Sequence, residues 1–141
     1  MFCYTEHIIC IEDIVRFLLC VLEVEMSQLL QEIEALRKPM KELNDFIFDH
    51  PELGNEEFQA HELLTNLLEK EGFIVDREVS GLKTAFRAVY HVNGGGPNIG
   101  LLCEYDALEG LGHACGHNLQ GPSICTAAIA LKRTLQAPCT L

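Results

Sequence analysis

The sequence predicts a layered α/β domain in which helices flank an incomplete sheet. Three observations support this fold class: apolar residues recur at helical spacing near 29–47, 60–68 and 124–135, β-rich segments fill 73–92, and the nearly continuous apolar stretch NIGLLCEY (98–105) leads into the last helix. At 141 residues the chain forms one domain at most.

Residues 1–25 are set apart as an N-terminal extension, and 26–141 as the domain itself. The extension has no basic start, and acids interrupt its apolar run, so it predicts neither a signal peptide nor a membrane span. Its apolar residues fall on one helical stripe: Ile8, Ile11, Val15, Leu18 and Leu22. Met26 is an alternative start.

The first two helices of the domain follow from apolar periodicity and from helix-ending residues. The first covers the apolar positions Leu29, Ile33, Leu36, Met40, Leu43 and Ile47, and Pro39 should kink or divide it. After the turn DHPELGNEE (49–57), Asn55 is predicted to cap a second helix whose apolar face is Ala60, Leu63, Leu64, Leu67 and Leu68. Gly72 should end that helix.

The strands are predicted from β-rich and alternating residues. FIVDREV (73–79) and TAFRAVYHV (84–92) have these patterns, and NGGGPN between 93 and 98 must turn. The segment 98–105 is predicted to be a strand covered on both faces. A helix with the stripe Ile124, Ala128, Leu131 and Leu135 follows and is stopped by Pro138; a further strand is expected after it, but the chain stops three residues later.

Charge and cysteine content narrow the classes of function. A formal net charge of -11 repels phosphate backbones, so nucleic acid is not expected as a partner, and neither is a membrane. The 7 cysteines are scattered and form no CxxC pair, which favours a reducing, cytoplasmic compartment over a disulfide scaffold.

The residues that carry chemistry lie in LLCEYDALEGLGHACGHNLQG (101–121). His113, Cys115 and His117 follow the end of the predicted strand, where ligands bind in open α/β sheets. Imidazole and thiolate are good ligands for zinc and similar metals, and Asp106 could hold a ligand imidazole by a hydrogen bond. A redox-active thiol at Cys115 and a purely structural turn are the alternatives.

LCEYDALEGLGHACGHN, together with DHPELGNEE and GLKTAFRA, resembles metallopeptidase family M-twenty. The closer resemblance is to its amidohydrolase branch, which holds aminobenzoyl-glutamate hydrolases, amino-acid-conjugate hydrolases and aminoacylase-1-like dipeptidases. The resemblance covers about residues 40 to 136. It implies that the chain is the N-terminal part of a layered α/β metallohydrolase catalytic domain, truncated at 141.

The resemblance also implies roles for individual residues. Cys115 and His117 match the first two metal ligands, and Asp106 matches the acid that supports them. His113 matches the pattern without being a ligand, and His50 belongs to the upstream turn. Other branches carry a histidine ligand where Glu104 stands, and relatives usually have proline at Glu109.

The expected function is metal-dependent hydrolysis of small amide bonds, in dipeptides or N-acyl amino acids, by the complete protein. Zinc is the first candidate metal, with manganese or cobalt next, and the full-length relative is expected to be a homodimer. The glutamate pair that includes the family's general base lies downstream, so this chain is expected to be inactive alone. Two alternatives stay open: a non-catalytic fragment that binds metal or a partner, and a thiol redox protein.

Overall fold

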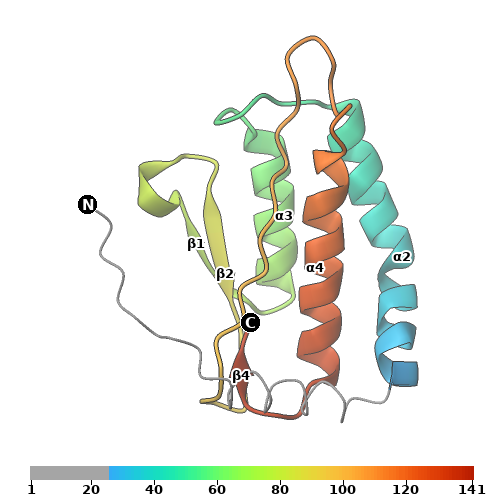
Figure 1. Ribbon diagram of the computed structural model, residues 1–141, viewed down its shortest axis with the longest axis vertical. Helices are drawn as coiled ribbons and strands as arrows, with labels where there is room; N and C mark the ends of the chain where they lie inside the picture. The colour runs from blue at the N-terminus through green and yellow to red at the C-terminus, as the bar shows by residue number, and fades with distance from the viewer. Residues whose placement is uncertain (1–25) are drawn as a thin grey trace.

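In the part of the chain that the structure describes, three α-helices form one layer, and a hairpin with a long extended segment lies against it (Figure 1). The computed structural model describes residues 26–141. The predicted extension and its apolar stripe lie outside that range, and the alternative start, Met26, is its first residue. The helices are α2 (Met26–Asp49), α3 (Phe58–Lys70) and α4 (His117–Thr134). Among the described residues, no helix is long and apolar enough to cross a membrane.

Helix α2 confirms the predicted periodicity but is not divided at Pro39. Leu36, Met40 and Ile47 are the buried members of the predicted stripe. Proline removes one backbone hydrogen bond from the helix. Leu36 and Met40 flank Pro39 and both pack into the main core, which compensates for that loss and keeps the helix continuous.

Helix α3 has the predicted apolar face and the predicted end, but a different beginning. Asn55 has a left-handed φ of 68° and lies in a turn, so the prediction that it caps the helix is wrong. The Glu52 carboxylate instead accepts hydrogen bonds from the backbone amides of Gln59 and Ala60, at 2.9 Å each for the shortest pairs. At the other end Gly72 has φ 84°, and the amides of Gly72 and Phe73 bond back to Glu69 and Leu68 as a glycine-terminated helix requires.

The strands are shorter than predicted and lie within the predicted segments. β1 (Ile74–Arg77) and β2 (Phe86–Val89) form an antiparallel hairpin in which Ile74 is opposite Val89, and the short 3-10 helix η1 (Val79–Gly81) lies in its connection. β3 (His91–Val92) pairs antiparallel with β4 (Cys139–Thr140). The residues after Pro138 therefore already begin a strand, although the sequence alone assigned them none.

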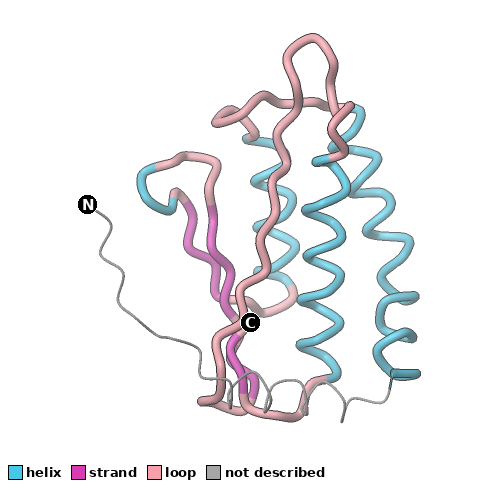
Figure 2. The backbone as a smooth tube through the Cα atoms, in the orientation of Figure 1, coloured by secondary structure: helices cyan, strands magenta, loops and turns pink. Residues whose placement is uncertain are grey.

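The segment 98–105 is extended, as predicted, but it is not a strand covered on both faces. Only Asn98 forms a β-bridge, with Thr140, and Leu102 is 90% exposed. Figure 2 shows the segment as a loop that runs along the helices to the upper end of α4. A strand needs paired backbone on its edges and a layer on each face. Within the described residues the helices cover one face only, so the prediction of two covered faces is wrong.

The core lies where α2, α3 and α4 meet the hairpin. Its buried members are Leu36, Met40, Leu64, Leu68, Phe73, Cys125, Ala128 and Ile129. A smaller cluster of Val92, Leu135, Cys139 and Leu141 anchors the end of the chain. This arrangement confirms the predicted fold class, a partial α/β domain with an incomplete sheet and flanking helices.

Candidate metal centre

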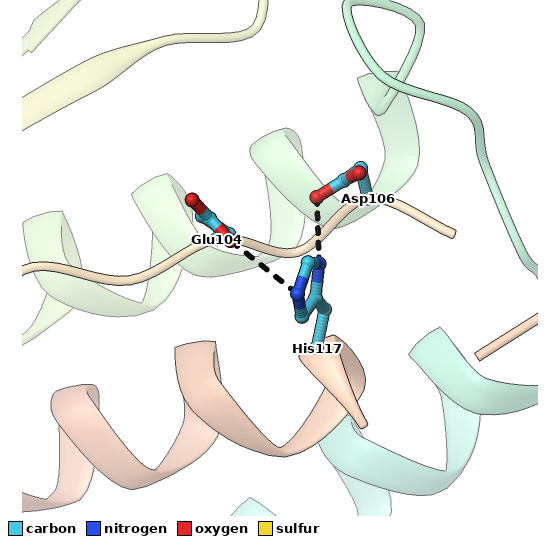
Figure 3. A group of neighbouring side chains, drawn as sticks. All are labelled: Glu104, Asp106 and His117. Atoms are coloured by element: carbon cyan, nitrogen blue, oxygen red, sulfur yellow. Dashed lines mark hydrogen bonds and ion pairs between the residues drawn. The ribbon is translucent and has the colours of Figure 1, made fainter. Parts of the chain in front are cut away.

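His117 lies between two carboxylates at the beginning of α4 (Figure 3). Its Nδ1 is 2.8 Å from Asp106 Oδ1, and its Nε2 is 3.3 Å from Glu104 Oε2. One ligand atom from each of the three residues lies within 4.8 Å of the other two. We call Glu104, Asp106 and His117 the His–carboxylate cluster.

Local backbone geometry explains why these three side chains meet. Successive side chains on an extended chain point to opposite faces, so Glu104 and Asp106, two apart, point the same way. Gly116 has φ 82° and its amide bonds to the His113 carbonyl oxygen at 2.9 Å, and this tight turn places His117 as the first residue of α4. The Gln120 side chain accepts a hydrogen bond from the Glu104 amide at 3.1 Å, which ties the extended segment to the helix.

The upstream turn DHPELGNEE supports the acidic side of the cluster. The Ala107 amide donates to the Glu52 carbonyl oxygen at 2.7 Å, and Leu53 forms a parallel bridge with Ala107. A Cβ atom built on Gly54 would lie 3.9 Å from Asp106 Oδ2, so a small residue fits beside the carboxylate. Two motifs far apart in sequence are therefore in contact around Asp106.

Thr84, from GLKTAFRA, joins the third motif to the same region. Its hydroxyl donates to the buried Glu57 carboxylate at 2.6 Å, and its carbonyl oxygen accepts from His61 Nδ1 at 2.9 Å and from the Tyr105 hydroxyl. Burial raises the pKa of Tyr105, which keeps its hydroxyl protonated as a donor. Because Tyr105 lies between Glu104 and Asp106, this network holds the backbone that carries both acids.

The remaining residues named from the sequence lie outside the cluster. Cys115 is exposed, two residues before His117, and its thiol is not in the group of ligand atoms within 4.8 Å. His113 is 6% exposed, and neither of its ring nitrogens has a hydrogen-bond partner among the described residues. Burial lowers the pKa of His113. His50 stacks on Phe46 and bonds to its carbonyl oxygen at 2.8 Å, so it closes α2 as a turn residue.

The donor set of the cluster fits a divalent cation. In neutral imidazole one nitrogen donates and the other has a lone pair. A hydrogen bond from Nδ1 to Asp106 leaves the lone pair on Nε2, beside the Glu104 carboxylate. Glu104 is 69% exposed at its side chain, so this side of the imidazole is open to a cation. The sequence reasoning did not assign Glu104 as a ligand, although it noted that other branches of the family carry a histidine ligand at this position.

No protein-family model matches the chain, but several known proteins do. It is 42% identical over 121 residues to a subunit of the p-aminobenzoyl-glutamate hydrolase of Escherichia coli, covering 74% of this chain and 25% of that protein. It is 37% identical over 124 residues to Xaa-Arg dipeptidase of Mus musculus, covering 82% and 29%. It is 30% identical over 107 residues to thermostable carboxypeptidase 2 of Saccharolobus solfataricus, covering 61% and 27%.

The fold and the relatives together identify the chain as part of an α/β hydrolase domain. More narrowly, the chain belongs to the amidohydrolase branch of metallopeptidase family M-twenty and corresponds to its N-terminal part. This confirms the resemblance seen in the sequence motifs. The chain spans a quarter to a third of the length of the relatives that it matches.

Proposed function

We propose that this chain supplies the first metal ligands of an enzyme that hydrolyses small amide bonds. The observation that supports this proposal best is the His–carboxylate cluster, in which Asp106 fixes the His117 imidazole and leaves Nε2 beside Glu104. Relatives named as a dipeptidase and as part of a p-aminobenzoyl-glutamate hydrolase support the class of reaction.

In this proposal each residue has a separate task. His117 binds the metal through Nε2, and Asp106 orients the ring by accepting a hydrogen bond from Nδ1–H. Cys115 provides a sulfur ligand two residues earlier, in the turn that precedes α4. Because the Cys115 thiol lies outside the cluster, its side chain must rotate inward when it binds the metal.

A divalent metal held there would polarise the amide carbonyl and make water a better nucleophile at neutral pH. The chain's own residues would hold the metal and orient its ligands. The general base in this proposal is a glutamate outside residues 1–141. Dipeptides or N-acyl amino acids are the proposed substrates, and zinc, then manganese or cobalt, the proposed metals. A cytoplasmic homodimer is the proposed form of the complete enzyme.

The first test is metal binding by the 141-residue chain. We expect zinc and cobalt to bind, cobalt to give a thiolate-to-metal absorption band, and His117→Ala or Cys115→Ala to weaken binding by at least about tenfold. His91→Ala is the matched control, since His91 is exposed in β3, bonds to Thr140 and should leave metal binding unchanged. Unchanged affinity in His117→Ala would refute the ligand assignment.

Alkylation of Cys115 separates the metal-ligand proposal from a thiol redox protein. Cys115 is exposed, whereas burial raises the pKa of Cys125 to about 12, so Cys115 should react with iodoacetamide well before Cys125. We expect zinc to slow the alkylation of Cys115, as mapped by peptide mass spectrometry. Equal rates with and without zinc would favour the redox alternative, in which the metal does not protect the thiol.

The second test is turnover by the chain alone. We expect no hydrolysis of dipeptides or N-acyl amino acids with zinc, manganese or cobalt, because a hydrolytic site needs several ligands and a positioned base. Metal-dependent turnover that disappears in Cys115→Ala would contradict this expectation. It would mean that the base lies within these residues, and Glu104 would then be the first candidate.

A further inference from the structure

His113 has a buried imidazole, and the proposed metal centre does not use it. The residue is 6% exposed, and neither ring nitrogen forms a hydrogen bond with a described residue. Imidazole has at least one N–H donor whether it is neutral or charged. A buried donor without an acceptor costs free energy, so a histidine kept in this position needs a physical explanation.

Contacts on both sides of His113 place it against the end of α2. A Cβ atom built on Gly112, the preceding residue, would lie 3.9 Å from Pro51 Cβ. Beyond His113, the buried Asn118 side chain donates a hydrogen bond to Asn44 Oδ1 of α2 at 2.8 Å. Figure 1 shows the end of α2 beside the beginning of α4. The imidazole is therefore buried against the last turns of α2, between Asn44 and Pro51.

The Ile47 carbonyl oxygen lacks a full hydrogen-bond donor at this end of α2. In a continuing helix it would accept from the amide of residue 51, but residue 51 is proline and has no N–H. It shares the His50 amide, whose nitrogen is 3.3 Å from this oxygen and 3.1 Å from the Phe46 carbonyl oxygen. Ile47 is 2% exposed, so its carbonyl is shielded from solvent and needs a donor from the protein.

The Ile47 carbonyl lies beside the His113 ring. Burial lowers the pKa of His113, and this carbonyl raises it by a smaller amount. A buried donor without an acceptor and a buried acceptor without a full donor are therefore neighbours. A rotation about χ2, which is a broad torsion in histidine, would align a ring nitrogen with the carbonyl oxygen.

We propose that His113 is a positioning residue, whose imidazole N–H donates to the Ile47 carbonyl oxygen in place of the amide that Pro51 lacks. This bond attaches the turn before α4 to the end of α2. The His113 carbonyl oxygen accepts from the Gly116 amide at 2.9 Å, so holding His113 also holds the backbone around Cys115. The effect on a metal rests on the proposed function, whereas the attachment of the turn does not.

A histidine that only fills space is the alternative, and it predicts the opposite effect of an apolar substitution. If the imidazole bonds to nothing, His113→Leu removes an unpaired polar group and should stabilise the chain. If the imidazole donates to Ile47, the same substitution leaves a buried carbonyl without a donor and should destabilise the chain. The direction of the change in stability therefore separates the two explanations.

The test follows amide hydrogen exchange at Gly116 by NMR, on the 141-residue chain in metal-free buffer. His113→Leu should speed this exchange by at least about tenfold and lower the midpoint of urea denaturation, because the turn loses its attachment to α2. Asn places an amide nitrogen where Nδ1 lies, and Gln places one where Nε2 lies. Either His113→Asn or His113→Gln should therefore restore the slow exchange.

Pro51→Ala provides the second arm, because it returns the missing amide to residue 51. In this background His113→Leu should change the Gly116 exchange by less than about threefold, since the Ile47 carbonyl has another donor. His91→Leu replaces an exposed histidine of β3 and is the matched control, which should leave the exchange unchanged in both backgrounds. If His113→Leu alone does not fold, folding of the double variant supports the bond, and its failure to fold refutes it.

Two results would overturn the attachment of the turn. The first is unchanged exchange, or a raised urea midpoint, in His113→Leu. The second is an equal loss with Leu, Asn and Gln at position 113, or an equal loss in the two backgrounds at position 51. Either form of the second result would mean that the shape of the ring, rather than its bond to Ile47, holds the turn.

Zinc affinity of the same variants tests the positioning role separately. It should fall by at least about tenfold in His113→Leu and recover in the variant that restores slow exchange. Unchanged affinity together with faster exchange would overturn the positioning role. If the unsubstituted chain binds no zinc but the exchange results hold, the proposed function fails, and the attachment of the turn to Ile47 is supported without it.

Discussion

The hydrogen bond between His117 and Asp106 determines which imidazole nitrogen is free for a cation. With the proton on Nδ1 held by Asp106 at 2.8 Å, the lone pair is on Nε2, and Glu104 lies 3.3 Å away on that side. The two carboxylates therefore have different tasks in the proposed site, although both touch the same ring. In that proposal Asp106 positions the imidazole and Glu104 shares the bound ion.

Asp106→Asn tests the positioning role. The amide can present its nitrogen or its oxygen to Nδ1, so the tautomer is no longer fixed, and zinc affinity should fall by about 10- to 100-fold. Titration of the 141-residue chain against a competing chelator measures this fall. Glu109→Gln, which removes an exposed acid three residues away, is the control and should change affinity little. Equal affinities of Asp106→Asn and the unsubstituted chain would contradict the role.

Single residues also show what the sequence could predict about the site and what it could not. Asp106 and His117 were named from their types and spacing, and they are in contact. Glu104 was not assigned as a ligand, because the family resemblance gave that role to Cys115 and His117, although other branches carry a histidine ligand at this position. Its contact with His117 depends on the bond from its amide to Gln120, a tertiary contact that spacing does not encode.

At the scale of elements, the buried faces of the helices could be predicted from the sequence. The contacts that begin and end each helix were harder to predict. The buried positions of α2 and α3 follow the helical period because one stripe must meet the core. The beginning of α3 was mispredicted at Asn55, since its capping acceptor, Glu52, lies 7 residues before Gln59 in the sequence. The end at Gly72 was predictable because a left-handed residue there is a purely local requirement.

The contact between α3 and α4 depends on Gly121. A Cβ atom at this position would lie 3.0 Å from Leu64 Cδ1 and 3.1 Å from Leu64 Cδ2, and Leu64 is fully buried. Leucine at 64 and glycine at 121 therefore let the two helices approach each other closely. A bulky side chain at 121 has no empty space to enter.

Gly121→Val should lower the free energy of unfolding by about 1–3 kcal/mol, because the added methyl groups must displace Leu64 in a packed core. Urea denaturation followed by circular dichroism measures the change. Ser123→Val is the matched control: it puts the same side chain two residues along α4 at an exposed position and should cost well under half as much. Equal losses in the two variants would show that β-branching in the helix, rather than the Leu64 contact, causes the effect.

At the scale of the whole molecule, the helix layer is well packed and the sheet is incomplete. Segment 98–105 was predicted from its apolar run to have two covered faces, and a run of this kind is what a central strand of a larger sheet would have. Among the described residues no strand pairs with 100–105, a fact that the sequence alone could not show. The consequence is an apolar surface around Leu102, which is 90% exposed, and Leu119, which is 56% exposed.

This surface should make the isolated chain associate. Leu102 from the extended segment and Leu119 and Ile124 from α4 line a shallow hollow. Burying one leucine contributes about 1.5–3 kcal/mol. The net charge of -11 opposes contact between copies, so association should increase with salt, which screens that repulsion. Sedimentation velocity over a range of concentrations and ionic strengths measures both effects.

Leu102→Lys should weaken this association by at least about tenfold, since a tenfold change in affinity corresponds to about 1.4 kcal/mol and the lost burial exceeds that. Leu82→Lys is the matched control, because Leu82 is also an exposed leucine, at 52%, but lies next to η1 in the hairpin connection. Both variants change the net charge equally, so a difference between them isolates the apolar contact at Leu102. If both weaken association to the same extent, charge is the cause and the surface around Leu102 is not the interface.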